Sequence, residues 1–271
     1  MKIKFYGTRG SFPVSRPGVM NFGGNTSCIV VEAANKQQIV IDSGTGIRNY
    51  GGDLLKAGNQ KEIFIFYTHF HMDHVQGLPF FMPAYDKSFT IHLASLQEDK
   101  GPDQLKLMID NMMSPQFCPV TFDMLHADFH IHDMQLMKKL LAGIEMETIP
   151  LNHPGGCGGI KITDQEGKSI AVMVDNELTD DFDTYMPFCR GVDVLIHDAQ
   201  YTDEEYKTTK GWGHSTFNRT VALATQAQVG QLVMTHHDPD HEDHFLATEE
   251  RICQDLYPKS ELAKEGLVVE V

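Results

Sequence analysis

The sequence of 271 residues predicts a single domain of the α/β class. Apolar runs of strand length recur along the chain, and stretches with apolar residues at helical spacing lie between them. Six of the apolar runs end in an acidic residue or a histidine. No linker, low-complexity tract or repeat of fixed period divides the chain, so one domain over residues 1–271 is the simplest interpretation.

The composition limits the classes of partner. Hydrophobic residues make up 41% of the chain, which is enough for a sizeable core, and 22 basic against 37 acidic residues give a formal net charge of −15. A protein this acidic is not expected to hold long nucleic acids or anionic membranes by diffuse electrostatic attraction. A small anionic substrate remains compatible if metal ions neutralise its charge locally.

The cysteines and the first residues indicate the compartment. Five cysteines without a Cys-x-x-Cys pair are typical of reduced thiols rather than of a disulfide framework. The first residues, MKIKFYGTRG, contain no apolar core of a signal peptide, and no later stretch is long and apolar enough to span a membrane. We therefore expect a cytoplasmic protein with no membrane partner.

The pattern of apolar residues predicts the following elements. Strands are expected at 2–6, 28–32, 38–41, 63–67, 144–151, 168–174, 192–196, 231–234 and 266–271. Helices are expected at 51–58, 102–113, 215–228 and 248–257. Residues 115–135 show no strand-end pattern, and their histidines, His126, His130 and His132, are expected at the surface.

One stretch concentrates potential metal ligands. The apolar run 63–67 opens directly into His69-Phe70-His71-Met72-Asp73-His74. Because residues two apart in extended backbone point the same way, His69 and His71 can reach one cation, while Asp73 and His74 on the following turn can reach a second. A single histidine is more often a hydrogen-bonded surface or core residue, but three histidines and an aspartate at this spacing favour a metal site. Imidazoles mixed with carboxylates suit zinc, manganese or iron.

Other apolar runs end in side chains of the same kind. In α/β proteins functional groups gather beyond the carboxyl ends of the strands. The sequence therefore predicts one sheet edge lined with metal-binding side chains. The six strand ends concerned are Asp42, His69, His153, Asp175, His197-Asp198 and His236.

The His-x-His-x-Asp-His run resembles the signature of the metallo-β-lactamase superfamily, and further matching motifs extend from residue 42 to residue 236. Members of that superfamily are αββα sandwiches, so the resemblance implies two mixed β-sheets flanked by helices. It also implies a site for one or two metal ions and the hydrolysis of an ester, an amide or a phosphodiester.

The resemblance assigns a role to each strand end. It implies that His69, His71 and His153 bind the first metal, and that Asp73, His74 and His236 bind the second. Asp175 stands in the position of a carboxylate that bridges both metals, and Asp42 in that of an aspartate that braces the ligand loop. An aspartate at 175, rather than a cysteine, is similar to the phosphodiesterase and ribonuclease branches.

Three further motifs, His197-Asp198-Ala199, Gly213-His214-Ser215 and Thr235-His236, resemble the ribonuclease Z-like branch. The resemblance implies that His214 faces the scissile phosphate and that Asp198 orients it. The structural alternatives are a helix-entry residue for His214 and a cap for Asp198. We hypothesise that His214 protonates the departing alkoxide, and we count His214, Asp198 and Asp73 as the catalytic residues.

The expected chemistry uses two divalent cations, with zinc the first choice and manganese or iron open. Two cations roughly 3.5–4 Å apart hold a bridging hydroxide and clamp the attacking and leaving oxygens of an in-line displacement. Ribonuclease Z grips transfer RNA with a basic arm, but the segment 97–143, an expected insertion or lid, contains only four lysines and no arginine. Stable binding of long nucleic acids is therefore not expected.

The N-terminal run 7–13, with 23–27 and 175–177, resembles a bacterial subgroup whose members are often assigned as phosphohydrolases, including cyclic-nucleotide phosphodiesterases. A small phosphodiester, best a 3′,5′-cyclic nucleotide, is therefore the expected substrate. Arg9 in this run either contacts a phosphate or a base, or pairs with a surface acid, and the second role is favoured. The His- and Asp-rich residues 237–244 are expected in a solvated loop rather than at a third metal site.

Three other functions remain open. The chain is alternatively a ribonuclease Z-like processing nuclease, a hydrolase of carboxylic esters, lactones or thioesters, or a sensor that binds metal without catalysis. Turnover of a phosphodiester compared with that of an acyl ester separates them. A homodimer is a further implication of the resemblance.

Overall fold

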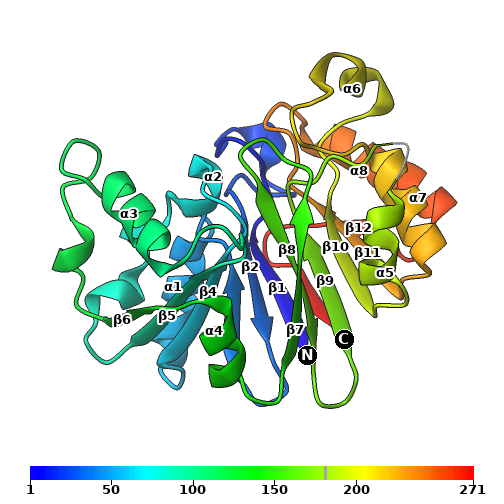
Figure 1. Ribbon diagram of the computed structural model, residues 1–271. Coiled ribbons are helices and arrows are strands. Elements are labelled where there is room, and N and C mark those ends of the chain that lie inside the picture. Colours follow the sequence, from blue (N-terminus) through cyan, green and yellow to red (C-terminus); the bar gives the residue numbers. More distant parts are fainter. Residues whose placement is uncertain (180–181) are drawn as a thin grey trace.

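The computed structural model describes residues 1–179 and 182–271. In these ranges two β-sheets face each other, and helices cover the outer face of each sheet (Figure 1). Each sheet contains both parallel and antiparallel strand pairs. The predicted αββα sandwich of two mixed sheets is therefore confirmed.

The first sheet has, in the described part of the chain, seven strands in the order β13-β1-β2-β3-β4-β5-β6. Strands β3, β4, β5 and β6 are parallel to one another. The pairs β13–β1, β1–β2 and β2–β3 are antiparallel. The bounds are β1 (Lys2–Gly7), β2 (Cys28–Glu32), β3 (Gln38–Ile41), β4 (Glu62–Tyr67), β5 (Thr90–Ser95), β6 (Asp128–Ile131) and β13 (Val268–Glu270).

The second sheet has six described strands in the order β12-β11-β10-β9-β8-β7. Strands β9 to β12 are parallel, and β7, β8 and β9 form an antiparallel meander. The bounds are β7 (Glu145–Leu151), β8 (Cys157–Thr163), β9 (Ser169–Met173), β10 (Val194–Asp198), β11 (Gln231–Thr235) and β12 (Ser260–Leu262).

Helices α1 and α3 pack on the outer face of the first sheet, and α5, α7 and α8 on that of the second (Figure 1). The α-helices are α1 (Ile47–Ala57), α2 (Met72–Val75), α3 (Pro102–Met112), α4 (Met134–Leu140), α5 (Met186–Cys189), α6 (Asp203–Thr209), α7 (Phe217–Ala227) and α8 (Asp243–Leu256). The 3₁₀ turns are η1 (Pro17–Val19), η2 (Leu78–Phe80), η3 (Met82–Tyr85), η4 (Phe122–Met124) and η5 (Asp183–Tyr185). None of the described helices is long and apolar enough to cross a bilayer.

Strand β4 shows why the run before the ligand loop is apolar throughout. Phe64 and Phe66 point into the core between the sheets, and Ile63, Ile65 and Tyr67 point into the core under α1 and α3. Both faces of the strand are buried, so successive side chains are all apolar instead of alternating with polar ones. Packing on both faces holds the end of β4, and with it the loop that begins at Thr68.

Several elements differ from the sequence-based prediction. Helix α1 begins at Ile47 and α8 at Asp243, both earlier than expected, and β5, β6, β8 and β12 were not predicted. Strand β8 begins Cys-Gly-Gly, and glycines weaken the pattern of side chains by which a strand is recognised. Residues 115–135, where no strand-end pattern was found, contain β6, which forms the edge of the first sheet.

Two of the histidines expected at the surface belong to this edge. The rings of His130 and His132 stack on His92 of β5, with centroids 5.3 and 5.1 Å away. Both side chains are only partly exposed. The segment 97–143 thus contains α3, η4, β6 and α4, and the single-domain assignment and the lid role of this segment stay predictions.

Candidate metal centre

The structure brings together all seven side chains that were predicted to bind metal. Strands β3, β4, β7, β9, β10 and β11 end at the same rim of the sandwich, and the predicted residues follow their carboxyl ends. The side chains fall into two groups that lie next to each other. Site 1 consists of His69, His71, His153 and Asp175, and site 2 of Asp73, His74 and His236.

In site 1 the donor atoms face a common point. His71 Nδ1 lies 2.9 Å from His153 Nε2. His69 Nε2 and His153 Nε2 each lie 3.5 Å from Asp175 Oδ2. The side chains of His69, His153 and Asp175 are buried, whereas His71 is exposed, so site 1 opens to solvent on the side of His71.

Site 2 is buried and equally compact. His74 Nε2 and His236 Nε2 are 3.3 Å apart, and each lies within 3.3 Å of Asp73 Oδ2. Both nitrogens also face the second oxygen of Asp175, Oδ1, at 3.2 Å for His74 and 3.0 Å for His236. Asp175 therefore turns one oxygen toward each site, which is the geometry of a carboxylate shared by two cations.

These contacts fit a pair of metal ions better than a hydrogen-bonded cluster. Four ligands arranged tetrahedrally around zinc at about 2.0–2.1 Å lie about 3.3 Å from one another, close to the spacing in both sites. Two of the facing atoms, His69 Nε2 and Asp175 Oδ1, are buried and make no hydrogen bond among the described residues; the two imidazole nitrogens near Asp175 Oδ1 lie close to it without hydrogen-bond geometry. Because buried polar atoms are rarely left without a partner, these two atoms indicate a bound group.

The charges of the centre point the same way. Burial alone would raise the pKa of the Asp175 carboxyl, but three neighbouring histidines lower it well below its usual range. Burial lowers the pKa of His69 well below its usual value, so this ring is neutral. Burial would also lower the pKa of His74, but the carboxylates around it raise that pKa well above its usual value. An ionised carboxylate and a neutral imidazole are the forms that bind metal, so Asp175 and His69 are ready to do so. The raised pKa of His74 reflects the buried negative charge around it, which a cation would neutralise in place of the proton.

Asp42 braces the ligand loop and is not directed at either site. It is fully buried, and its carboxylate accepts hydrogen bonds from the backbone N–H of Thr68 at 2.9 Å and from the Thr68 hydroxyl. His74 Nδ1 lies 2.7 Å from Asp42 Oδ2. This contact fixes the ring so that Nε2 is directed toward Asp73 and Asp175.

Other groups that orient the predicted ligands were not found from the sequence. Gln200 Oε1 lies 2.9 Å from His236 Nδ1, and the carbonyl of Gly213 lies 3.0 Å from His153 Nδ1. The backbone N–H of Ser11 donates to Asp73 Oδ2 at 2.7 Å. Gln200 could have been found from the sequence, since it lies two residues after the end of β10. The contacts of the Ser11 N–H and the Gly213 carbonyl cannot be predicted from residue types, because every residue has these backbone groups.

Backbone strain also concentrates here. Asp42, Asp175 and His236 have φ values of 64, 54 and 63°, in the left-handed region that residues other than glycine seldom adopt. Such conformations cost on the order of 1–3 kcal/mol each and persist where the surrounding structure enforces them, typically at functional sites. Each of these residues follows a strand, and the turn directs Asp175 and His236 into the centre and Asp42 toward Thr68 and His74 of the ligand loop.

His214 and Asp198 form a pair beside the two sites. His214 Nδ1 lies 2.6 Å from Asp198 Oδ2, and Asp198 Oδ1 accepts from the backbone N–H of Ser215 at 3.0 Å. Burial would lower the pKa of His214, but the Asp198 carboxylate raises it to about 9. The His214 ring stacks on that of His236 with centroids 4.8 Å apart, so its free Nε2 side lies at the metal centre.

The interpretation of Arg9 was wrong in both of its forms. The side chain is fully buried and donates to the carbonyls of Gly23, Asp238 and His241, so it neither pairs with a surface acid nor reaches a substrate. The expected solvated loop at 237–244 was also wrong for His237, which is buried with Nε2 2.8 Å from the Ala263 carbonyl. These contacts tie the N-terminal loop to the segment that follows His236.

Comparison with known proteins identifies the family. A family model described as "Beta-lactamase superfamily domain" matches residues 37–237. The chain belongs to this superfamily. The predicted resemblance to the metallo-β-lactamase superfamily is thereby confirmed, and the matched residues include all seven members of the two sites.

Individual relatives agree with this assignment. A ribonuclease Z of Prochlorococcus marinus (strain NATL2A) is 23% identical over 329 aligned positions that cover 100% of this chain and 99% of that protein. A diphosphatase from the PhnP family has a similar structure, with a TM-score of 0.71, 19% identity and coverage of 100% and 97%. Zn²⁺-bound PqqB from Methylobacterium extorquens gives a TM-score of 0.74 at 14% identity, with 100% of both chains covered. The two structures show the fold.

This metallo-β-lactamase-fold chain is a metal-dependent hydrolase, as predicted. Its His and Asp clusters are able to hold metal, as the family's divalent-metal chemistry requires. The family and the relatives, rather than the ability to hold metal, disfavour the alternative of a sensor without catalysis. The assignment of individual ligands to individual metals stays a prediction.

Proposed function

We propose that the protein is a binuclear metal-dependent phosphodiesterase that hydrolyses a small phosphodiester, best a 3′,5′-cyclic nucleotide. The observation that carries this proposal is the orientation of Asp175, whose two oxygens face two separate groups of ligands. His214 beside it, held by Asp198, supplies a proton donor. Two cations and a general acid at one site are the groups needed to displace an alkoxide from phosphorus.

When bound, two cations, zinc in our proposal, would supply an activated water at neutral pH and neutralise charge on the phosphate. His69, His71 and His153 would hold one of them at site 1, and the more buried Asp73, His74 and His236 would hold the other at site 2. Asp175 belongs to both. The ligand set is also compatible with manganese and iron.

His214 is proposed to act as the general acid. The 2.6 Å contact with Asp198 holds the proton on Nδ1 toward the carboxylate, so Nε2 is the atom that can deliver a proton to a leaving oxygen. Asp198 is fully buried, and its second oxygen accepts from backbone N–H groups of Ser215 and Gln200. Asp198 is therefore fixed, and it fixes the plane of the imidazole in turn.

The size of the substrate follows from charge. A net charge of −15 and a segment 97–143 with lysines at only four positions disfavour a long polyanion. The names of two relatives, a ribonuclease and a diphosphatase, both describe cleavage of a bond to phosphorus. A small phosphodiester satisfies both considerations. A cytoplasmic location and a homodimer stay predictions.

A ribonuclease Z-like activity is the second candidate, because the similarity to ribonuclease Z extends over the whole chain. Hydrolysis of a carboxylic ester, lactone or thioester is the third. All three use the same metal centre and differ in the group that is cleaved.

One experiment separates them. Purified protein with measured metal content is assayed against 3′,5′-cyclic mononucleotides, cyclic dinucleotides, a precursor transfer RNA, bis-p-nitrophenyl phosphate and p-nitrophenyl acetate. The proposal predicts the highest kcat/KM for a cyclic mononucleotide. Cleavage of the RNA at a higher kcat/KM, or turnover of the acyl ester alone, would replace it with the second or third candidate.

A further inference from the structure

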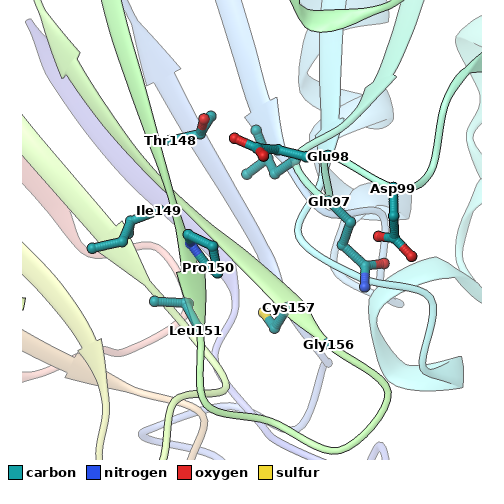
Figure 2. A pocket seen from close by; sticks show the side chains of 10 residues that line it. Gln97, Glu98, Asp99, Thr148, Ile149, Pro150, Leu151, Gly156 and Cys157 are labelled. Carbon is teal, nitrogen blue, oxygen red and sulfur yellow. The ribbon is translucent and has the colours of Figure 1, made fainter. Parts of the chain in front are cut away.

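A pocket lies next to the solvent-open side of site 1. It is formed between strand β7 and the loop that follows β5, and its volume is about 210 Å³. Figure 2 shows this loop facing the strand across the pocket, with Cys157 and Gly156 at one end. Its lining residues are Leu96–Asp99, Thr148–Leu151, Gly156 and Cys157.

The pocket adjoins the residues that carry the metal-binding side chains. The backbone N–H of Gly158 donates to the carbonyl of Thr68 at 2.9 Å, and Thr68 directly precedes His69. Cys157 Sγ lies 3.3 Å from the carbonyl of Val174, which directly precedes Asp175. The other wall, β7, leads after Leu151 into His153. The pocket and the metal centre therefore share one boundary, the turn 153–156.

That boundary has no side chain in its second half. Gly155 and Gly156 both have a φ of 83°, a conformation that favours glycine. A Cβ on Gly155 would lie 3.8 Å from His71 Nε2, and one on Gly156 would lie 2.8 Å from Gln97 Nε2. The turn itself contributes only backbone here, and the Gln97 side chain, which donates to the Gly155 carbonyl at 3.1 Å, lies over it, so a substrate bound at site 1 would pass along Gln97 to reach the pocket.

The lining of the pocket suits the neutral end of a nucleotide. Apolar groups of Leu96, Pro150 and Cys157 offer contact to a flat ring, and a volume of 210 Å³ is below the roughly 300–1,000 Å³ of pockets for drug-sized molecules. One base fits, whereas a second nucleotide does not. The two carboxylates at the rim would repel a phosphate, so the charged end of the substrate belongs at the metals.

The two carboxylates are not equivalent. Figure 2 shows Glu98 extending from its loop toward Thr148 across the pocket, while the carboxylate of Asp99 is directed away from β7. Asp99 pairs with Lys100 at 2.7 Å. Among the described residues Glu98 has no hydrogen bond or ion pair that would occupy it. An ionised glutamate accepts hydrogen bonds and donates none, so it selects a ligand that presents N–H groups.

We propose that this pocket binds the base of the substrate and that Glu98 accepts a hydrogen bond from an exocyclic amino group. The inference rests on the proposed function and narrows it to cyclic nucleotides whose base carries an amino group. Hypoxanthine is the informative comparison, because it presents a carbonyl oxygen where adenine carries its amino group and lacks the 2-amino group of guanine. An oxygen facing the Glu98 carboxylate is repelled rather than bound.

The test compares kcat/KM for 3′,5′-cyclic AMP, cyclic GMP and cyclic IMP in the wild type, Glu98→Ala and Asp99→Ala. The wild type should prefer one amino-bearing base over hypoxanthine by about tenfold, a modest factor because Glu98 is exposed at the rim. Glu98→Ala should abolish the preference. Asp99→Ala, which removes the same charge from the neighbouring residue, should keep it. Equal rates in the wild type, or a preference that survives Glu98→Ala, would overturn the inference.

A binding measurement keeps this test separate from the proposed function. Adenosine, guanosine and inosine contain no phosphate, so calorimetry with these nucleosides probes the pocket even if no phosphodiester is cleaved. We expect adenosine or guanosine to bind about tenfold more tightly than inosine, and Glu98→Ala to remove the difference. If the protein hydrolyses bis-p-nitrophenyl phosphate but does not discriminate among the bases, the base-binding role of the pocket is rejected and the proposed phosphodiesterase activity is kept. If it discriminates among the nucleosides in binding but hydrolyses no phosphodiester, the pocket binds bases and the proposed activity is rejected.

Discussion

Replacing His214 by alanine tests whether this residue donates a proton while the other residues of the centre bind metal. The Nδ1 of His214 is engaged by Asp198 at 2.6 Å and its ring stacks on His236, so Nε2 is positioned for proton transfer to the leaving oxygen. Proton transfer from a positioned side chain contributes about 10²–10⁴ in rate. At about 1.36 kcal/mol per tenfold, this corresponds to about 2.7–5.5 kcal/mol of transition-state stabilisation.

The assay uses two leaving groups of different basicity. The sugar alkoxide released from a cyclic nucleotide is a strong base and needs a proton, whereas the p-nitrophenolate released from bis-p-nitrophenyl phosphate is a weak base and does not. His214→Ala should therefore lose about 10²–10⁴ in kcat with the cyclic nucleotide and at least about tenfold less with the p-nitrophenyl ester. Metal content, measured by elemental analysis, should stay at the wild-type value.

A second variant separates chemistry from folding. Removing the ring leaves the buried Asp198 oxygen without its partner, which costs about 1–3 kcal/mol of stability. His214→Gln retains an amide donor for Asp198 but no acid, so it should be as inactive as the alanine variant and more stable in urea unfolding. Equal losses with both substrates would refute a proton-donating role, and full activity in either variant would remove His214 from the mechanism.

Three further perturbations test the support of the centre. A Cβ on Gly10 would lie 2.2 Å from His236 Nδ1, so Gly10→Ala should weaken binding of the second metal about ten- to a hundredfold, as measured in competition with a chromophoric chelator. Gly52→Ala is the control, because a Cβ there has nothing within 4 Å, and it should bind two metals as the wild type does. Glu177 accepts hydrogen bonds from the backbone N–H groups of Gly211 and Gly213, which precede His214. Glu177→Gln should therefore lower the free energy of unfolding by roughly 1–2 kcal/mol and reduce turnover. An unchanged midpoint of urea unfolding would contradict this. Removing metal with a chelator should lower Tm, because metals bind the folded chain and a metal at a hundred times its Kd adds about 2.7 kcal/mol; equal Tm values with and without metal would argue against a structural contribution from the centre.

The parts of the site that the sequence predicted share one property. His69, His153, Asp175 and His236 each follow an apolar run, and the packing of both sheets brings the ends of these runs to one rim. A residue's type and its place after a strand are both visible in the sequence. The assignment of these residues to two metals followed from the resemblance and stays a prediction. The structure places the same side chains in two neighbouring groups, and it also places Asp175 and His236 with Asp198 and His214.

What the sequence did not show depends on backbone geometry and on contacts between distant segments. Asp73 accepts from the backbone N–H of Ser11, and the backbone carbonyl of Gly213 accepts from His153; any residue type provides these backbone groups. Strand β8 was missed because its first half, Cys157 to Gly159, has too few side chains to show a period of two. The burial of Arg9 was missed because it depends on carbonyls of two distant segments, at Gly23 and at 238–241.

The central claim is that two cations share Asp175, and anomalous diffraction from crystals of the metal-loaded protein tests it most directly. We predict two peaks in the centre, one beside His69, His71 and His153 and one beside Asp73, His74 and His236, about 3.5–4 Å apart with Asp175 between them. Asp175→Ala should reduce the metal content below two per chain. A single peak, or metal bound away from these residues, would contradict the account.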